Sequence, residues 1–299
     1  MNLPALAGSL TKQKFRFEGV SMKKTLSMKA LGACAAALIG AAGPAAFAQS
    51  APEVTLTRMA DCGTTQPPTE VNIRFSDTWA FPGLKTTFTY SCYLIKHGDD
   101  YMMWDTGQPL AAPNVAPKTS LPDQLAQLNL KPENIKFVGI SHYHGDHTGE
   151  VASFPGATLL IGKGDWDGIT AAKPPAGVNV ALFTNWTTGG GKVEPVVGDK
   201  DVFGDGSVIM INTPGHTPGH HSLLVKLAGM GPVILSGDLA HFHENYESNG
   251  VPGFNDNRAN TIASIERVKQ LTKTIKAKLI LQHDSRDLNK LPAFPTAAK

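Results

Sequence analysis

The sequence has 299 residues, 41% of them hydrophobic and 17% charged, which is ordinary for a globular protein and enough for one large domain or two small ones. Residues 1–48 hold six of the 27 Lys and Arg residues and one of the 25 acidic residues, so the rest of the chain has a net charge of about −3. That part contains no Lys/Arg run and no apolar stretch long enough to span a bilayer, which excludes the usual patterns of nucleic-acid-binding and transmembrane proteins.

The N-terminal segment has the pattern of a secretory signal peptide. Residues 22–29 form a basic region, residues 30–46 an alanine-rich apolar region, and residues 46–48 match the A-x-A cleavage signal. A buried helix or a membrane anchor is the weaker interpretation, because the apolar run is short and interrupted by Gly and Pro. We expect cleavage before Gln49 and a periplasmic or secreted mature protein, with residues 1–48 as extension and signal. Met22 heads a complete signal peptide and is an alternative start.

Beyond this segment, apolar and alternating runs predict strands separated by turns and helices. The sequence H-G-D-D at residues 97–100 predicts a hairpin between residues 91–97 and 101–104. Ser120, followed by Pro122 and Asp123, is typical of a helix start. The other predicted strands are residues 54–59, 137–140, 158–161, 207–212, 222–227, 232–235 and 278–281, and the predicted helices are residues 121–128 and 258–274. This order predicts an α/β sandwich with the helices outside.

Residues 162–200 are rich in Gly, Pro, Trp and Asn and show no clear period. We expect a long irregular connection there, of the kind that often borders a binding site.

Two cysteines, Cys62 and Cys92, lie beyond the signal segment, and neither is part of a metal-binding motif. An oxidising compartment would favour a disulfide between them. Two buried thiols are the alternative that the sequence leaves open.

The most informative stretch follows the apolar run at residues 137–140. Within six residues, His142, His144, Asp146 and His147 supply three imidazoles and a carboxylate. Residues two apart in an extended segment point the same way, so His142 and His144 can bind one cation together. Where the chain turns towards a helix, Asp146 and His147 project to the other side and can bind a second cation. These are the ligands of zinc and similar divalent metals, and such groups would be costly to bury without a cation.

Three further candidate ligands, His216, Asp238 and His283, each follow a predicted strand. Ligands at strand ends converge on one edge of a sheet, where a rigid frame can fix the coordination geometry. A single histidine at a strand end is more often an ordinary core or surface residue, so the prediction of a shared site depends on the whole set. His220 and His221 follow so closely that we expect supporting or strand-start roles for them.

The order H-x-H-x-D-H, P-G-H, G-D and a C-terminal His, with Asp105-Thr106-Gly107 upstream, resembles the metallo-β-lactamase superfamily across residues 53–290. Residues 91–107, 214–220 and 280–284 are similar to the N-acyl-homoserine lactone lactonases, which degrade bacterial quorum-sensing signals. The resemblance implies a four-layer αββα sandwich over residues 49–299, with the metals at one edge. It also implies a metal-dependent hydrolase with a small-molecule lactone substrate. From the charge pattern we expect no nucleic-acid partner, and after signal cleavage no membrane partner; an oligomer is possible.

Carried over position by position, the resemblance implies two divalent metal ions, with zinc as the first expectation and iron, cobalt or manganese as alternatives. The ligands of one ion would be His142, His144 and His216. Those of the other would be Asp146, His147 and His283, with Asp238 bridging the two ions.

The expected mechanism follows from these charges. Two cations that share a water lower its pKa towards roughly 7, so a metal-bridging hydroxide would be available at neutral pH. This hydroxide would attack the lactone carbonyl while a metal polarises the carbonyl oxygen. The ring oxygen must leave as an alcohol, and Asp146 is the candidate that delivers its proton.

The sequence departs from the lactonase pattern at two positions. His241 replaces a tyrosine that often hydrogen-bonds the substrate carbonyl; it is expected either to do the same or to support a ligand. Gly145 replaces a bulky apolar residue, so the acyl pocket would be wider or built from elsewhere. Trp79, Phe81 and Trp186 are candidate walls, with core or loop packing as the alternative.

Other functions of the same fold are open to comparison. A β-lactamase with this first motif lacks the bridging aspartate that Asp238 would provide. Thioesterases of the glyoxalase II type add a C-terminal region, for which the chain beyond His283 is too short, and flavodiiron proteins have Glu in place of His144. Phosphotriester hydrolysis and a non-catalytic periplasmic metal-binding role remain alternatives.

Overall fold

The computed structural model describes residues 52–299, so the predicted signal peptide and the alternative start at Met22 lie outside the described residues. The strands are β1 (Val54–Arg58), β2 (Pro68–Glu70), β3 (Lys85–Thr87), β4 (Tyr93–His97), β5 (Asp100–Trp104), β6 (Ile135–Ile140), β7 (Thr158–Gly162), β8 (Val193–Val196), β9 (Lys200–Asp201), β10 (Val208–Asn212), β11 (His221–Leu227), β12 (Gly231–Leu235) and β13 (Lys278–Ile280). The α-helices are α1 (Val71–Arg74), α2 (Leu121–Gln127), α3 (Gly145–Thr148), α4 (Lys163–Ile169), α5 (Thr184–Thr187), α6 (His243–Ser248) and α7 (Arg258–Ile275). Short 3-10 segments are η1 (Pro132–Asn134), η2 (Val151–Ser153), η3 (Val180–Phe183), η4 (Gly237–Leu239) and η5 (Ser285–Lys290). In this range no helix has both the length and the apolar character needed to cross a membrane.

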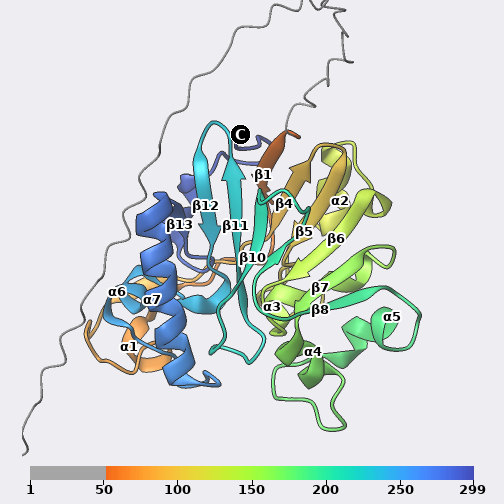
Figure 1. Ribbon diagram of the computed structural model, residues 1–299. Coiled ribbons are helices and arrows are strands. Elements are labelled where there is room, and N and C mark those ends of the chain that lie inside the picture. The colour runs from red at the N-terminus through yellow and green to blue at the C-terminus, as the bar shows by residue number, and fades with distance from the viewer. Residues whose placement is uncertain (1–51) are drawn as a thin grey trace, which may run out of the picture. The chain divides into compact units, whose positions relative to one another are not determined.

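Two mixed sheets form the centre of the fold (Figure 1). The first has the strand order β1-β4-β5-β6-β7-β8 and the second β13-β12-β11-β10-β9, while β2 pairs with β3 separately. The predicted hairpin is confirmed, since β4 and β5 are antiparallel with His97 opposite Asp100. From β5 to β8 neighbouring strands are parallel, an arrangement that needs crossover connections over the face of the sheet.

Alternation along the strands divides the apolar side chains between an inner and an outer face. Ile95 of β4 lies in the core between the two sheets, whereas its neighbour Leu94 faces outwards and clusters with Leu121 of α2. On the second sheet, Ile234 faces outwards and packs in a cluster with Ile265 of α7. Figure 1 shows α7 along one outer side and α2 on the other. Four layers result, and the predicted αββα class is confirmed.

The longer helices begin where their capping residues predict. The Ser120 hydroxyl accepts a hydrogen bond from the Asp123 backbone N–H at the start of α2. Asn257 caps α7 in the same way through the Asn260 N–H, and α7 ends at Ile275, followed by Lys276 in the left-handed conformation.

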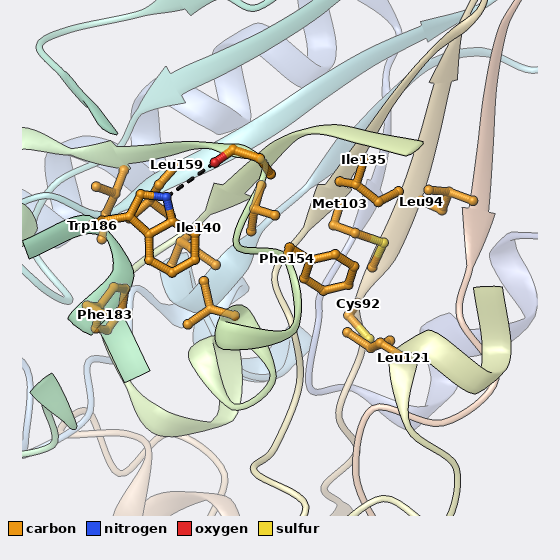
Figure 2. Close-up of a cluster of buried hydrophobic side chains, with 14 of the residues drawn as sticks. Cys92, Leu94, Met103, Leu121, Ile135, Ile140, Phe154, Leu159, Phe183 and Trp186 are labelled. Atoms are coloured by element: carbon orange, nitrogen blue, oxygen red, sulfur yellow. Dashed lines mark hydrogen bonds between the residues drawn. The ribbon is translucent and has the colours of Figure 1, made fainter. Parts of the chain in front are cut away.

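Residues 162–200 do not form the irregular connection that we expected. The segment contains α4, η3, α5 and the edge strand β8, which pairs in parallel with β7. Each of these elements is too short to show a hydrophobic period, which is why the sequence did not predict them. Packing against the rest of the fold stabilises them. Phe183 and Trp186 are buried in the outer cluster of the first sheet, and the Trp186 indole N–H donates to the Ala157 carbonyl at 3.2 Å (Figure 2).

Of the two alternatives for the cysteines, the structure has the disulfide. Cys62 and Cys92 are bonded with their Cα atoms 5.9 Å apart, and both are buried. The Gln108 N–H donates to the Cys62 carbonyl at 2.8 Å. The disulfide therefore anchors the turn that carries Asp105, Thr106 and Gly107 towards the candidate site.

Candidate metal centre

The first group of donors forms where β6 ends and α3 begins. His142 and His144 come directly after the strand, and His216 reaches them from the loop after β10. His144 Nδ1 lies 2.9 Å from His142 Nε2 and 3.0 Å from His216 Nε2. Three imidazoles from distant parts of the chain thus turn nitrogen atoms towards one point.

The second group lies on the other side of the same turn. His147 Nε2, on α3, is 3.2 Å from His283 Nε2, which follows β13. Asp146 Oδ2 is 3.7 Å from His283 Nε2 and 3.9 Å from His147 Nε2. The side chain of Asp146 is 23% exposed, whereas the two imidazoles are buried.

Asp238 lies between the two groups, and each of its oxygens faces one of them. Oδ2 is 3.2 Å from His216 Nε2, while Oδ1 is 2.8 Å from His283 Nε2 and 3.1 Å from His147 Nε2. Gly237 makes this placement possible, since it has a φ of +56° and a Cβ there would lie 2.6 Å from His220 Nε2. The structure therefore brings together all seven predicted ligands.

The donor set fits two divalent cations. Nitrogens bound tetrahedrally to one zinc at about 2.0–2.1 Å lie about 3.3 Å apart, close to the separations found here. Two neutral imidazoles cannot both direct lone pairs at each other at such a distance without a proton or a cation between them. Each of the two groups of donors, His142, His144, His216 and Asp238 on one side and Asp146, His147 and His283 on the other, falls within 4.8 Å.

Charge at the centre has the same implication. Burial opposes ionisation of Asp238, but His283 and His147 outweigh it and hold the pKa of that carboxyl well below its usual range. Burial opposes protonation of His147, yet Asp238 and Asp105 raise its pKa well above the usual value. Burial dominates at His142 and lowers its pKa well below the usual value, with a further contribution from His147. One side of the cluster thus attracts positive charge while the other offers neutral nitrogen.

Asp105 fixes the orientation of the first motif from behind. It is fully buried and accepts hydrogen bonds from the Ser141 N–H at 2.7 Å, the Gln282 amide at 2.6 Å and His147 Nδ1 at 2.8 Å. A donating Nδ1–H leaves Nε2 of His147 as the nitrogen that can bind a cation. Sequence reasoning placed Asp105 in the family pattern without assigning it this contact.

Two other residues support the ligands. His283 Nδ1 is 2.7 Å from the Thr89 carbonyl, so its Nε2 points into the centre. His220 Nε2 accepts a hydrogen bond from the Asp238 N–H at 2.9 Å, in agreement with the supporting role expected for it. His221 begins β11, as expected.

Asp165 was not predicted as part of the site. Its buried carboxyl accepts hydrogen bonds from the Tyr143 N–H, the Thr217 hydroxyl and the Gly219 N–H. These donors belong to the two loops that carry His142 and His216. Asp165 therefore ties both loops together.

A cavity of about 670 Å³ opens over the donor cluster. Its floor includes His144, Asp146 and Asp238, and its walls include aromatic and polar side chains of α1 and of the segments before β4 and before α7. The wall residues include Gln66, Pro67, Pro68, Thr69, Arg74, Phe75, Phe88, Tyr90, Gln108, Gly177 and Phe254. This size suits a small organic substrate.

Two of the five predicted substrate contacts line this cavity. Gly145 does, and a Cβ there would meet nothing within 4 Å, which agrees with a wider pocket. The prediction of three aromatic walls is wrong, because Trp186 lies in the core, Trp79 is 66% exposed, and neither they nor Phe81 line the cavity. The true walls carry no sequence motif; position in the fold alone selects them.

His241 is the other predicted contact on the cavity wall. Its Nε2 is 3.1 Å from Asp238 Oδ2, and its ring stacks on His283 with centroids 5.5 Å apart. Burial lowers the pKa of His241 to about 4, so the ring is neutral at pH 7 and can donate from one nitrogen only. Donation to Asp238 favours the supporting role over a hydrogen bond to substrate.

Comparison with known proteins agrees with this geometry. Residues 86–277 match the model of the metallo-β-lactamase superfamily. The chain belongs to this superfamily. The predicted family, fold class and enzyme class, a metal-dependent hydrolase, are thereby confirmed.

Curated metallo-β-lactamase relatives include lactonases. The N-acyl homoserine lactonase AttM of Rhizobium radiobacter is 30% identical over 191 residues, which are 58% of this chain and 68% of that relative. The N-acyl homoserine lactonase AiiA of Bacillus thuringiensis subsp. kurstaki is 26% identical over 233 residues, which are 72% and 88% of the two chains.

Solved structures show the same fold. An N-acyl homoserine lactone hydrolase with N-hexanoyl-L-homoserine at its catalytic metal centre has a TM-score of 0.67 at 20% identity, covering 83% of this chain and all of that one. The dizinc quorum-quenching lactonase AidC has a TM-score of 0.63 at 20% identity, covering 83% and 91%. At this identity the likeness shows the fold alone.

Proposed function

We propose that the protein opens the lactone ring of N-acyl homoserine lactones. The observation that carries this proposal is the position of Asp238, whose two oxygens face two separate groups of donors at the floor of a substrate-sized cavity. The lactonase names of the relatives supply the substrate class. An attacking metal-bridging hydroxide is part of the proposal.

The seven donors would bind two divalent ions, most simply two zinc ions, and Asp238 would bind to both of them. When bound, such ions supply hydroxide at neutral pH and polarise the scissile carbonyl. The chain's residues position this chemistry: Asp105 and the Thr89 carbonyl hold His147 and His283 with Nε2 inward, and His220 holds the Asp238 backbone.

Asp146 is proposed to handle the proton. Its Oδ2 faces His283 and His147, and the residue also lines the cavity. The oxygen that leaves the opened ring needs a proton, and a carboxylate at this place can take up the proton of the attacking oxygen and pass it to that leaving oxygen. Asp146→Asn should therefore lower kcat about a hundredfold. Metal content should be measured alongside, because near wild-type activity with both metals bound would refute the role.

The substrate class is tested by incubating the metal-replete mature protein with N-hexanoyl- and N-decanoyl-homoserine lactone, a cephalosporin and an aryl phosphotriester. We expect the highest kcat/KM for the lactones. A clear preference for the cephalosporin would assign a β-lactamase, and a preference for the phosphotriester would assign that hydrolysis to the same centre. Bound metal without turnover of any of them would support a non-catalytic metal-binding protein.

We also propose export, on the basis of the N-terminal pattern of residues 22–48. Fractionation of expressing bacteria, followed by N-terminal sequencing, should find the protein beginning at Gln49 in the periplasm or the medium. A full-length cytoplasmic protein would contradict this.

A further inference from the structure

Arg74 is the basic side chain among the residues that line the cavity. The other charged groups there, Asp146 and Asp238, face the imidazoles of the donor cluster. Arg74 forms no ion pair with any side chain described in residues 52–299. Three other arginines each pair with carboxylates: Arg258 with Asp77, Arg267 with Asp199, and Arg286 with Glu244 and Asp284.

Arg74 is exposed, and its guanidinium lies against two aromatic rings of the wall. Its carbon lies 5.4 Å from the ring centroid of Phe75 and 6.0 Å from that of Phe254, both within range of a cation–π contact. The same two rings lie 4.8 Å and 5.8 Å from the ring of His241, beside the donor cluster. Arg74 therefore lies one aromatic layer away from the centre, where the part of a substrate distant from its scissile carbonyl would extend.

The wall around Arg74 is partly polar. Gln66 and Thr69 line the same cavity. The side-chain amide nitrogen of Gln66 donates to the Thr64 carbonyl. A plain alkyl chain could pack on the aromatic rings of this wall, but where it covered the guanidinium it would leave that group without a partner, which costs desolvation free energy. An oxygen acceptor on the chain would instead receive a charge-assisted hydrogen bond.

We propose that Arg74 makes the enzyme select acyl groups that carry an oxygen acceptor beyond the amide, either a carboxylate or a keto group. This inference deepens the proposed lactonase function and depends on it for the substrate class. A guanidinium can bind either acceptor, and a carboxylate in addition offers the bidentate geometry that arginine matches. Arg74 acts here as a specificity-determining residue that takes no part in bond cleavage.

Three substrates with the same six-carbon acyl length test this proposal: N-hexanoyl-, N-(3-oxohexanoyl)- and N-adipoyl-homoserine lactone. Arg74→Gln should lower kcat/KM about tenfold for at least one oxygen-bearing substrate, mainly through KM, and change it less than about twofold for the hexanoyl lactone. Loss confined to the adipoyl substrate identifies a carboxylate, and loss confined to the 3-oxo substrate identifies a keto group. An equal change for all three substrates, or no change, would overturn the proposal.

Matched variants separate this contact from general charge and folding effects. Arg74→Lys keeps the charge and should retain part of the preference. Lys131→Gln removes an equal charge at an exposed position that does not line the cavity, and should leave all three substrates unchanged. Thermal unfolding of Arg74→Gln within about 2 °C of the wild type would show that its fold is intact.

A binding measurement keeps the test independent of turnover. Isothermal titration of metal-free protein with the adipoyl and 3-oxohexanoyl lactones should show weaker binding to Arg74→Gln for the substrate that lost activity, and the wild-type preference for a carboxylate should fall with added salt. If no lactone is hydrolysed, the proposed function fails, and this titration alone tests the role of Arg74. Equal affinity of wild type and variant for both lactones would then overturn that role.

Discussion

The donor cluster and the aromatic wall of the cavity lie a few ångströms apart but are built differently. His142, Asp238 and His283 follow buried strands or the turn after them and are at most 4% exposed. The wall takes Phe75, which is buried, from the position after α1, and Phe254, which is 46% exposed, from the loop before α7. The chemistry thus depends on the rigid frame, whereas substrate choice depends on segments that can change without disturbing that frame.

The largest effect that this contrast predicts comes from Asp238, the residue that both donor groups share. Asp238→Asn replaces one carboxylate oxygen by an NH2 group that cannot bind a cation and removes the negative charge, so we expect kcat/KM to fall at least about a thousandfold, or about 4 kcal/mol of transition-state stabilisation. Metal analysis should show fewer than two ions per chain. Asp167→Asn, at an exposed surface pair with Lys163, is the matched control. A fully active Asp238→Asn protein would break the comparison.

A second prediction concerns stability of the frame beneath the donors. Burial raises the pKa of Glu150 from 4.5 to about 7, while hydrogen bonds from the Leu121 N–H oppose this. Because the pKa of Glu150 is higher in the folded than in the unfolded protein, its contribution to the free energy of unfolding is complete below pH 4.5 and is lost as pH rises through about 7. It amounts to at most about 3 kcal/mol.

Glu150→Gln keeps the acceptor and removes the titration. Chemical denaturation of wild type and variant between pH 4.5 and 8 should show the variant gaining stability relative to wild type as pH rises. Subtracting the two curves of unfolding free energy against pH removes the contribution of the histidines, which titrate in both proteins. Glu133→Gln, in the exposed η1 turn, serves as control. A pH-independent difference would contradict the assignment.

Asp105→Asn should have an effect between those of a ligand and a wall residue. The isosteric amide tolerates the left-handed φ of +55° at this position, so the backbone is not strained, but it cannot accept all the hydrogen bonds that converge on the carboxylate. We expect metal affinity and activity to fall about 10- to 100-fold, with excess metal restoring part of the activity. Unchanged affinity would mean that His147 needs no such support.

The sequence predicted the donor cluster because its members are metal-binding His and Asp residues that follow predicted strands. His142, His144 and His216 adjoin strands whose apolar runs are unmistakable, and the two sheets follow from the same runs. Alternation places side chains on a face but gives no distances between segments far apart in the sequence. For that reason Asp165 was missed, although it joins the loops of His142 and His216.

The wall was predicted wrongly for a related reason. A tryptophan in a glycine-rich segment reads equally well as a core or a cavity residue, and Trp186 proved to belong to the core. Phe75 and Phe254 adjoin segments with no period, so only tertiary packing brings them together, with ring centroids 6.0 Å apart. The same limit explains why short elements such as α4 and β8 were not expected between residues 162 and 200.

The smallest effect should come from the wall itself. Phe254→Ala removes a half-exposed ring that lies 5.9 Å from the ring of His216 without binding the donors through any polar atom. Since about half of its surface is available to a bound acyl chain, we expect KM for a decanoyl lactone to rise about fivefold, or about 1 kcal/mol, with kcat and metal content unchanged. Trp79→Ala, an exposed aromatic outside the cavity, should leave KM as it is. If Phe254→Ala lost metal or kcat as strongly as Asp105→Asn, wall and frame would be one unit, and substrate choice could not vary independently of the chemistry.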